Sequence, residues 1–213
     1  MLFRSARMDA DDLSLPGRVR AAATLLDQDH TLGAAATRVS MEGAGEGMAA
    51  YAAWQNGLLT PEDHARELFV EAPLCHPATV LRRAAVDAVG GYRDTPWPED
   101  WDLWLRLDAT GWRMAKSAET LFRWLHRRER LTFTHPRYTL ERLMDARAAY
   151  LPARLARIAG ARALVVWGAG PTGKALARGL ARHGVTADRF VDIDPKKIGR
   201  TARGAPIEIG RAH

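Results

Sequence analysis

One stretch constrains the fold of this chain more than any other, namely Trp97-Pro98-Glu99-Asp100-Trp101-Asp102-Leu103-Trp104-Leu105-Arg106-Leu107. Its apolar residues recur at the spacing of a helix with one buried face. Pro98 at the entry and Gly111 after the last turn are typical start and stop signals of a helix. Glu99 and Asp100 therefore lie at a helix N-terminus, where the dipole favours their ionised form. A fixed, charged carboxylate suits a general base, although acids are also common in first turns without any chemical role.

The composition is that of an ordinary globular chain. Its 213 residues are 47% hydrophobic and 26% charged, enough for one large domain or one and a half. No apolar run reaches the length of a membrane span, and the start lacks the apolar segment of a signal peptide. The single cysteine, Cys75, excludes an internal disulfide and fits a reducing compartment, so we expect a cytoplasmic protein.

The basic balance leaves several partners open. The formal charge is +6, and arginine is dense from Arg113 to Arg157. Such a run is typical of a solvated helical face, but it also suits a diphosphate, an anionic membrane surface or nucleic acid. Nucleic acid is the least favoured of these partners, because no reading motif accompanies the basic stretch.

The two ends of the chain have an unusual property at the level of DNA. Residues 1–5 can be back-translated into codons containing GCTCTTCCGATCT, and residues 208–213 into codons containing its reverse complement. That string resembles a common sequencing adapter. We therefore expect both ends to be adapter-derived and the fold to be incomplete, which the codons of the source DNA would test.

Three acids lie close together near the start of the chain, at Asp9, Asp11 and Asp12. Carboxylates this close repel one another unless a cation or hydrogen-bond donors offset them. Mg²⁺ and Mn²⁺ prefer oxygen ligands and bind through carboxylates together with substrate phosphates. The cluster is therefore either a metal site or an acidic turn before a helix.

Between these two acidic features, strand and helix patterns alternate. We expect strands over 32–41, 74–83 and 112–115, and helices over 19–26, 48–58, 61–70 and 84–89. Gly90 and Gly91 permit a tight turn. Tyr51 and Trp54 are expected in the core, and His76, which precedes a proline, is expected to be a structural turn residue.

Five short motifs follow one another in a characteristic order. They are MDADD (8–12), CHPATVLRR (75–83), VGGYRD (89–94), EDWDLWLRL (99–107) and LFRWLHRRERLT (121–132). Together they resemble the family 2 glycosyltransferases of GT-A fold, over roughly residues 6–150. The resemblance implies an α/β fold, with a partial GT-A (nucleotide-diphospho-sugar transferase) domain over 6–135 that lacks most of the half that holds the nucleotide base.

The resemblance also implies roles for individual residues. Asp9 and Asp11 match the DxD pair that binds a divalent metal, Mg or Mn, and the diphosphate of a nucleotide-sugar donor. Asp100, with Glu99, matches the acidic pair at the acceptor site, whose aspartate takes the proton of the attacking hydroxyl. His126 lies where some members place a further metal or diphosphate contact.

The implied activity is metal-dependent and inverting sugar transfer. The acceptor would be a saccharide or a lipid-linked molecule, in cell-surface polysaccharide or glycolipid synthesis. The enzyme would be cytoplasmic, either free or peripheral at the inner face of the membrane, and we expect this fragment to be inactive alone.

The C-terminal part carries a different fingerprint. A strand over 161–167, the loop GAGPTG, a helix over 174–183 and a strand over 190–194 follow in order. This is the dinucleotide-binding pattern, so we expect a partial Rossmann-like βαβ unit over 161–207, joined by a helical linker over 136–160 that Pro152 interrupts.

The same pattern marks candidate ligand residues. Gly168, Gly170 and Gly173 would let a phosphate approach the helix N-terminus. Asp192 or Asp194 would meet a ribose, as in a bound NAD(P). A purely structural βαβ unit remains an equal alternative.

Three functions are compatible with these features: a glycosyltransferase, an NAD(P)-dependent oxidoreductase that uses the C-terminal unit, and a nucleotide-binding or interaction module. The acid cluster and the helix at Glu99 favour the first, because neither of the others needs them.

Overall fold

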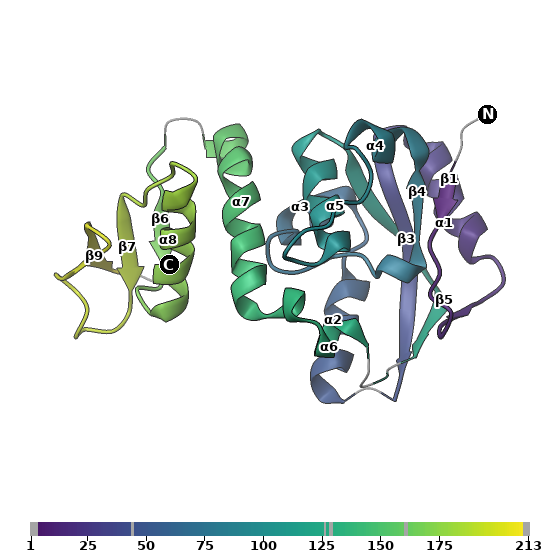
Figure 1. Cartoon of the computed structure of the whole chain (residues 1–213), viewed down its shortest axis with the longest axis horizontal. Coiled ribbons are helices and arrows are strands. Elements are labelled where there is room, and N and C mark those ends of the chain that lie inside the picture. The colour runs from purple at the N-terminus through teal and green to yellow at the C-terminus, as the bar shows by residue number, and fades with distance from the viewer. Residues whose placement is uncertain (1–3, 44, 126, 128–129, 160–161, 211–213) are drawn as a thin grey trace. The chain divides into compact units, whose positions relative to one another are not determined.

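The computed structural model describes residues 4–43, 45–125, 127, 130–159 and 162–210 (Figure 1). The chain divides into two compact units, residues 1–138 and 139–213, each with its own sheet and helices. Both units are α/β, in agreement with the fold class expected from the sequence. They are called the first and the second unit below, and each is described by itself.

The first unit is built on a five-stranded sheet with the order β1-β4-β3-β5-β2. Its strands are β1 (Arg4–Ala6), β2 (Leu13–Ser14), β3 (Leu32–Glu42), β4 (Thr79–Arg82) and β5 (Arg113–Leu125). The two long central strands, β3 and β5, run parallel, and the other pairings are antiparallel. β3 is buried from its first residue to Thr37, as expected for the middle strand of a sheet covered on both faces.

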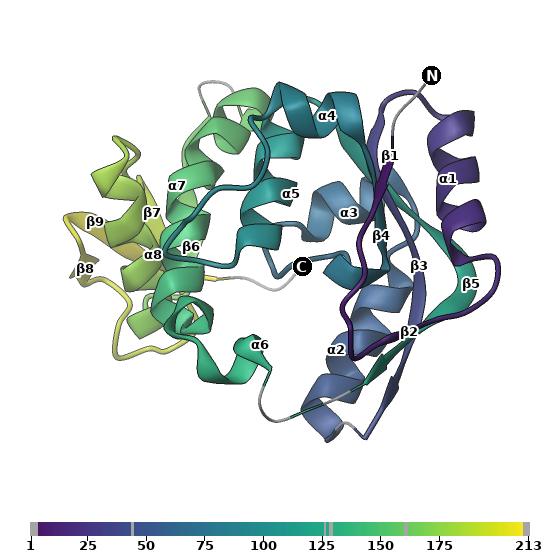
Figure 2. The same ribbon diagram turned by 45° about the vertical axis from the view of Figure 1, so that its right-hand side comes forward.

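Helices cover both faces of this sheet (Figure 2). Their bounds are α1 Arg18–Gln28, α2 Glu46–Gly57, α3 Pro61–Glu67, α4 Arg83–Ala88, α5 Glu99–Ala109 and α6 Leu131–Thr134, with 3₁₀ turns η1 His76–Ala78 and η2 Pro136–Tyr138. α1 packs on one face, where Leu26 and Ala22 meet Leu32 and Ala35 of β3. α2 to α5 lie on the other side.

α5 is more deeply buried than its sequence predicts. The expected apolar stripe is buried, but so are Asp102 and Arg106 on the remaining faces. These two form an ion pair at 2.7 Å, and Arg106 donates a second hydrogen bond to the carbonyl oxygen of Val89 at 2.7 Å. A buried charge is tolerated when it is paired and hydrogen-bonded in this way. The helix is therefore held on all sides, and its first turn is a rigid platform for Glu99 and Asp100.

Two strands of the first unit differ from expectation. The strand expected over 74–83 begins only at Thr79, because η1 occupies His76–Ala78. Pro77 has no N–H to give to a ladder, which explains the turn. The strand expected over 112–115 continues to Leu125 instead, with register shifts against β3 that let the polar segment at 117–119 pass.

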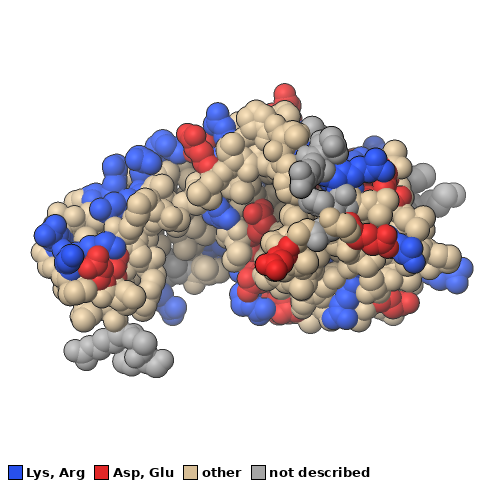
Figure 3. Space-filling view, turned by 90° about the horizontal axis from the view of Figure 1, so that it is seen from below, with Lys and Arg blue, Asp and Glu red and all other residues tan. Residues whose placement is uncertain are grey.

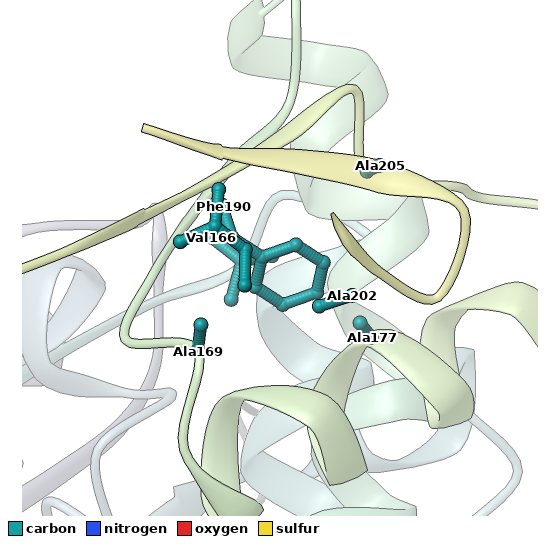
Figure 4. Close-up of a cluster of buried hydrophobic side chains, with 7 residues drawn as sticks. Val166, Ala169, Ala177, Phe190, Ala202 and Ala205 are labelled. Carbon is teal, nitrogen blue, oxygen red and sulfur yellow. The ribbon is translucent and has the colours of Figure 1, made fainter. Parts of the chain in front are cut away.

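The second unit has a sheet with the order β6-β7-β9-β8. Its elements are α7 Leu140–Ala159, β6 Val165–Trp167, α8 Pro171–Arg182, β7 Arg189–Asp192, β8 Thr201–Ala202 and β9 Ala205–Ile209. β6, β7 and β9 are parallel. Phe190 is fully buried at the centre of the core, among Val166, Ala177 and small residues (Figure 4).

The prediction that Pro152 interrupts the helical segment is wrong. α7 is a single helix with Pro152 inside it, and its residues fall within the second unit. It packs closely on α8, where a Cβ added to Gly179 would lie 2.7 Å from the Cβ of Ala148. We attribute the continuity of α7 to this packing, which compensates for the loss of the backbone hydrogen bond that a proline cannot donate.

None of the helices among the described residues combines the length and apolar character needed to cross a bilayer.

Candidate active site

The acid cluster lies in the turn between β1 and β2. The turn is closed by a hydrogen bond from the backbone N–H of Asp12 to the carbonyl oxygen of Asp9, at 3.3 Å. One carboxylate oxygen from each of Asp9, Asp11 and Asp12 lies within 4.8 Å of the others. The spacing in sequence therefore becomes a real cluster of oxygens, because β1 and β2 pair with β4 and β5 and hold the turn at both ends.

Asp12 is the buried member of the cluster. Its Oδ1 accepts hydrogen bonds from the backbone N–H of Leu125, at 3.0 Å, and from the guanidinium of Arg130. Its Oδ2 is buried and has no hydrogen-bond partner among the described residues. Burial raises the pKa of the Asp12 carboxyl, against the opposing effects of Leu125 and Arg130. A buried carboxylate oxygen without a donor is costly, and a bound cation would satisfy it.

Arginines surround the exposed side of the cluster. Arg130 lies 3.3 Å and Arg127 3.8 Å from the carboxylate of Asp11, and Arg7 lies 3.8 Å from that of Asp9. These cations offset part of the repulsion among the three acids. The remaining oxygens are hard ligands of the kind that Mg²⁺ and Mn²⁺ prefer, so the residues present fit a divalent metal.

Glu99 and Asp100 begin α5, as expected. Asp100 accepts a hydrogen bond from the backbone N–H of Trp101 at 2.8 Å and is partly exposed. Burial, followed by the charges of Glu99 and Asp9, raises the pKa of the Asp100 carboxyl to about 7. The helix dipole favours the ionised form, as expected, but desolvation and two nearby carboxylates outweigh it. A carboxylate that titrates near neutral pH is suited to accept a proton.

A pocket of about 370 Å³ lies beside these acids, lined by Arg7, His76, Tyr92, Arg93, Asp94, Glu99 and Arg137. Arg137 pairs with Glu99 at 3.1 Å and with Asp94 at 3.2 Å. It thereby joins the first turn of α5 to the loop that follows the glycine pair.

His76 and Tyr92 form the neutral part of the pocket wall. The Nε2 of His76 is 2.7 Å from the hydroxyl of Tyr92, and the guanidinium of Arg7 lies 5.9 Å from the Tyr92 ring centroid. Burial, helped by Arg7, lowers the pKa of His76 to about 4, so the imidazole is neutral at physiological pH. Burial and the nearby Asp100 and Glu99 charges raise the pKa of Tyr92 to about 12, against the effect of Arg7.

The acid turn and the start of α5 approach the same pocket. Arg7, two residues before Asp9, and Glu99, next to Asp100, both line it, and the charge of Asp9 contributes to the raised pKa of Asp100. His126, the third predicted metal contact, lies outside the described residues. Sequence reasoning missed Arg7, Tyr92, Arg130 and Arg137, because they are brought in by long-range contacts.

His76 was expected to serve only as a turn residue, yet it lines the pocket. The available signal was the position of His76 and Tyr92 inside two of the five ordered motifs.

The glycine loop of the second unit follows β6. Gly168 has a φ of +100° and donates its N–H to the carbonyl oxygen of Val191 at 2.7 Å. A Cβ on Gly173 would lie 1.8 Å from the carbonyl oxygen of Gly168, whereas a Cβ on Gly170 would meet open space. Gly173 is therefore required for helix–loop packing, whereas Gly168 is required for its positive φ and Gly170 has neither constraint.

Asp192 is engaged by its own unit. Its Oδ2 accepts hydrogen bonds from the N–H of Ala169, at 2.8 Å, and from Lys197, at 3.0 Å, and its Oδ1 accepts from the N–H of Asp194 at 2.9 Å. These contacts lower its pKa to about 2, the backbone N–H of Asp194 being the largest cause. Asp194 in turn accepts from the N–H of Lys196 at 3.0 Å. A carboxylate bonded in this way ties the loop to β7 and is poorly placed to bind a ribose.

A second pocket, of about 380 Å³, lies within the same unit. Leucines of α7 and α8, the strand β6 and the glycine loop line it. Its walls are mostly apolar, and the loop contributes backbone and the side chain of Thr172.

Comparison with known proteins finds no matching family model and no matching curated protein. Solved structures similar to the chain include Staphylococcus aureus TarS in complex with UDP-GlcNAc, at 15% identity and a TM-score of 0.48, over 84% of this chain and 48% of that one. Another is the mannosyltransferase PcManGT from Pyrobaculum calidifontis in complex with GDP-Man and Mn²⁺, at 16% identity and a TM-score of 0.41, over 84% and 44%. The chain spans about half the length of these structures.

Proposed function

We propose that the first unit is a glycosyltransferase domain that moves a sugar from a nucleotide-sugar donor to an acceptor hydroxyl. One observation carries the proposal. A three-aspartate cluster, in which a buried oxygen of Asp12 has no partner among the described residues, lies near a pocket. The carboxylate of Asp100, beside the same pocket, has a pKa raised to about 7. The first feature suits a divalent cation, and the second suits proton removal from a hydroxyl.

Asp9, Asp11 and Asp12 would hold the metal. Their oxygens are hard ligands, and the Oδ2 of Asp12 needs a positive partner. When bound, Mg²⁺ or Mn²⁺ supplies positive charge that stabilises a leaving nucleoside diphosphate. Arg7, whose guanidinium lies 3.8 Å from the Asp9 carboxylate, lines the pocket and would add a fixed cation that stabilises the negative charge of the leaving diphosphate.

Asp100 would take the proton of the acceptor hydroxyl. The rigid, buried body of α5 fixes its position, and Glu99 and Asp9 raise its pKa into the range where a base is both available and strong enough. Glu99, held by Arg137, would shape the pocket wall rather than react. On the basis of the order of the five motifs, we further propose that the reaction inverts the anomeric carbon. The acceptor would be a saccharide or a lipid-linked molecule.

The oxidoreductase alternative has less support. It requires Asp192 or Asp194 to meet a ribose, and the hydrogen bonds of Asp192 are already made within the second unit. The metal-dependent transfer proposal relies instead on Asp12, whose Oδ2 is buried and has no hydrogen-bond partner among the described residues.

Ligand-dependent thermal unfolding of the chain tests the donor and metal parts. We expect UDP- or GDP-sugars with Mn²⁺ to raise the unfolding temperature, and NAD(P)H not to do so. A ligand concentration of 100 times Kd should raise the free energy of unfolding by about 2.7 kcal/mol. Asp12→Asn should remove the Mn²⁺-dependent part, while Asp27→Asn, at an exposed ion pair with Arg4, should keep it. Stabilisation by NAD(P)H alone would contradict the proposal.

Replacement of the base tests the chemical step. Asp100→Asn should lower transfer or donor hydrolysis about 10²–10⁴-fold and spare donor binding. Asp108→Asn, in the last turn of the same helix, is the matched control and should retain activity. Near-normal turnover by Asp100→Asn would exclude Asp100 as the base.

A further inference from the structure

Positive charge is divided unequally between the two units. Residues 139–213 contain 14 Lys and Arg and 6 Asp and Glu, a net charge of +8. Residues 1–138 contain 17 and 19, a net charge of −2. Figure 3 shows basic side chains crowded over the second unit with few acidic ones among them. The excess of positive charge on this chain therefore belongs to the second unit, and sugar transfer in the first unit gives it no role.

Large apolar side chains are exposed at one end of the second unit's sheet. Trp167 ends β6 and is 66% exposed, and Ile193 directly follows β7 and is 77% exposed. The two strands are parallel, with Trp167 opposite Val191. Both side chains are therefore at the carboxyl end of the sheet.

Exposed cations lie at the same end. Lys174 is in the first turn of α8, which starts there, and Lys196 and Arg200 are in the loop that follows β7. Within the described part of the chain, none of these three side chains has an ion-pair partner. The acids nearby are already engaged: Asp192 and Asp194 with Lys197, and Glu208 with Arg189.

We propose that this end of the second unit docks on an anionic lipid surface. Exposed tryptophan and isoleucine combined with unpaired Lys and Arg match the two components of such a surface, an apolar interior and negative headgroups. A soluble polyanion would use the cations but would gain nothing from the apolar side chains, so the lipid is the better fit. The arginine-dense segment of the sequence, from Arg113 to Arg157, is not needed for this docking.

The test is vesicle co-sedimentation of the full chain. We expect binding to phosphatidylcholine vesicles that contain phosphatidylglycerol, little binding to phosphatidylcholine alone, and weaker binding at high salt. Lys174→Glu should lower the partition coefficient at least about fivefold, since one cation contributes roughly that factor near a charged membrane. It should not impair folding, because an acid in the first turn of a helix is favourable. Arg20→Glu, an exposed cation on α1 of the first unit, is the matched control and should bind like the wild type.

The apolar part needs its own variant. Trp167→Ala should also weaken binding, with an unchanged far-UV circular dichroism spectrum, because the side chain is mostly exposed. The proposal fails if neutral vesicles bind equally, if Lys174→Glu and Arg20→Glu behave alike, or if Trp167→Ala binds like the wild type. It also fails if soluble polyphosphate binds while vesicles do not, which would assign the surface to a polyanion. All of these results are independent of whether the first unit transfers sugar.

Discussion

Two buried aspartates, one in each unit, have pKa values that are shifted in opposite directions. Asp12 has a raised pKa and one oxygen without a partner among the described residues. Asp192 has a pKa lowered to about 2 and hydrogen bonds on both oxygens. Asp12 directly precedes β2 and Asp192 ends β7, both in acid-rich stretches, and the residue types alone do not distinguish them.

The difference teaches how to distinguish a site from a structural carboxylate. Asp192 is fully used by the N–H groups of its own loop and by Lys197, so it has little capacity left for a ligand. Asp12 is buried beside the charge of Asp11, which Arg130 partly offsets, and among the described residues its Oδ2 has no hydrogen-bond partner, so this oxygen has capacity left for a ligand. Unmet hydrogen-bonding capacity, rather than residue type, is the reason we place the proposed reaction in the first unit.

Exchange of the loop glycines should separate a tightly packed position from an open one. Gly173→Ala should destabilise the second unit by about 3 kcal/mol, because its Cβ would overlap the carbonyl oxygen of Gly168. Gly170→Ala should be close to neutral, since it has a negative φ and open space beside it. Hydrogen exchange of the β6 and β7 amides measures both variants. Equal protection in the two variants would contradict the role of Gly173 in the packing of α8 on the loop.

Asp→Asn substitutions in the two units should change stability in opposite directions. The native pKa of Asp100, about 7, lies above the ordinary value of 3.8, so ionisation above that value penalises the native state. Asp100→Asn removes this penalty and should raise the free energy of unfolding at pH 8 by on the order of 2–4 kcal/mol. The difference from the wild type should vanish as the pH falls below about 4.

Asp192→Asn should destabilise instead. The native pKa of Asp192, about 2, lies below the ordinary value, so its stabilisation is complete at neutral pH and is lost as the pH falls through 2. Thermal unfolding of both variants and the wild type at pH 5 and pH 8 measures the two shifts. Shifts of the same sign would break the contrast between the units.

Local signals account for the part of the fold that the sequence predicts. α5 begins at Glu99 because Pro98 precedes an apolar periodic run, and the strand–loop–helix pattern after residue 161 is equally local. β5 was predicted far too short, because its second half is held by pairing with β3 and β2 rather than by its own composition.

The site was predictable only in part for the same reason. Asp9, Asp11 and Asp100 were chosen from motifs, and these positions remain predictions as functional residues. Arg130 lies inside the fifth motif, but nothing local indicates that it reaches Asp12 across more than a hundred residues of chain. The sign of the Asp100 pKa shift could not be read from the sequence either, because it depends on burial and on Asp9, which the fold brings near.

Glu99 offers the smallest and most specific test of the electrostatic difference. Its charge is the second cause, after burial, of the raised pKa of Asp100, so Glu99→Gln should lower that pKa by less than one unit. Carbon-13 carboxyl shifts of Asp100 report the titration directly and do not require turnover. In an active preparation, the rising limb of the pH–rate profile should move to lower pH by the same amount. Asp108→Asn should leave both unchanged, because its side chain lies about two turns further along α5. An unmoved or raised Asp100 pKa in Glu99→Gln would mean that burial alone sets the proton affinity of the proposed base, and the pairing of carboxylates at the start of α5 would then have no part in tuning it.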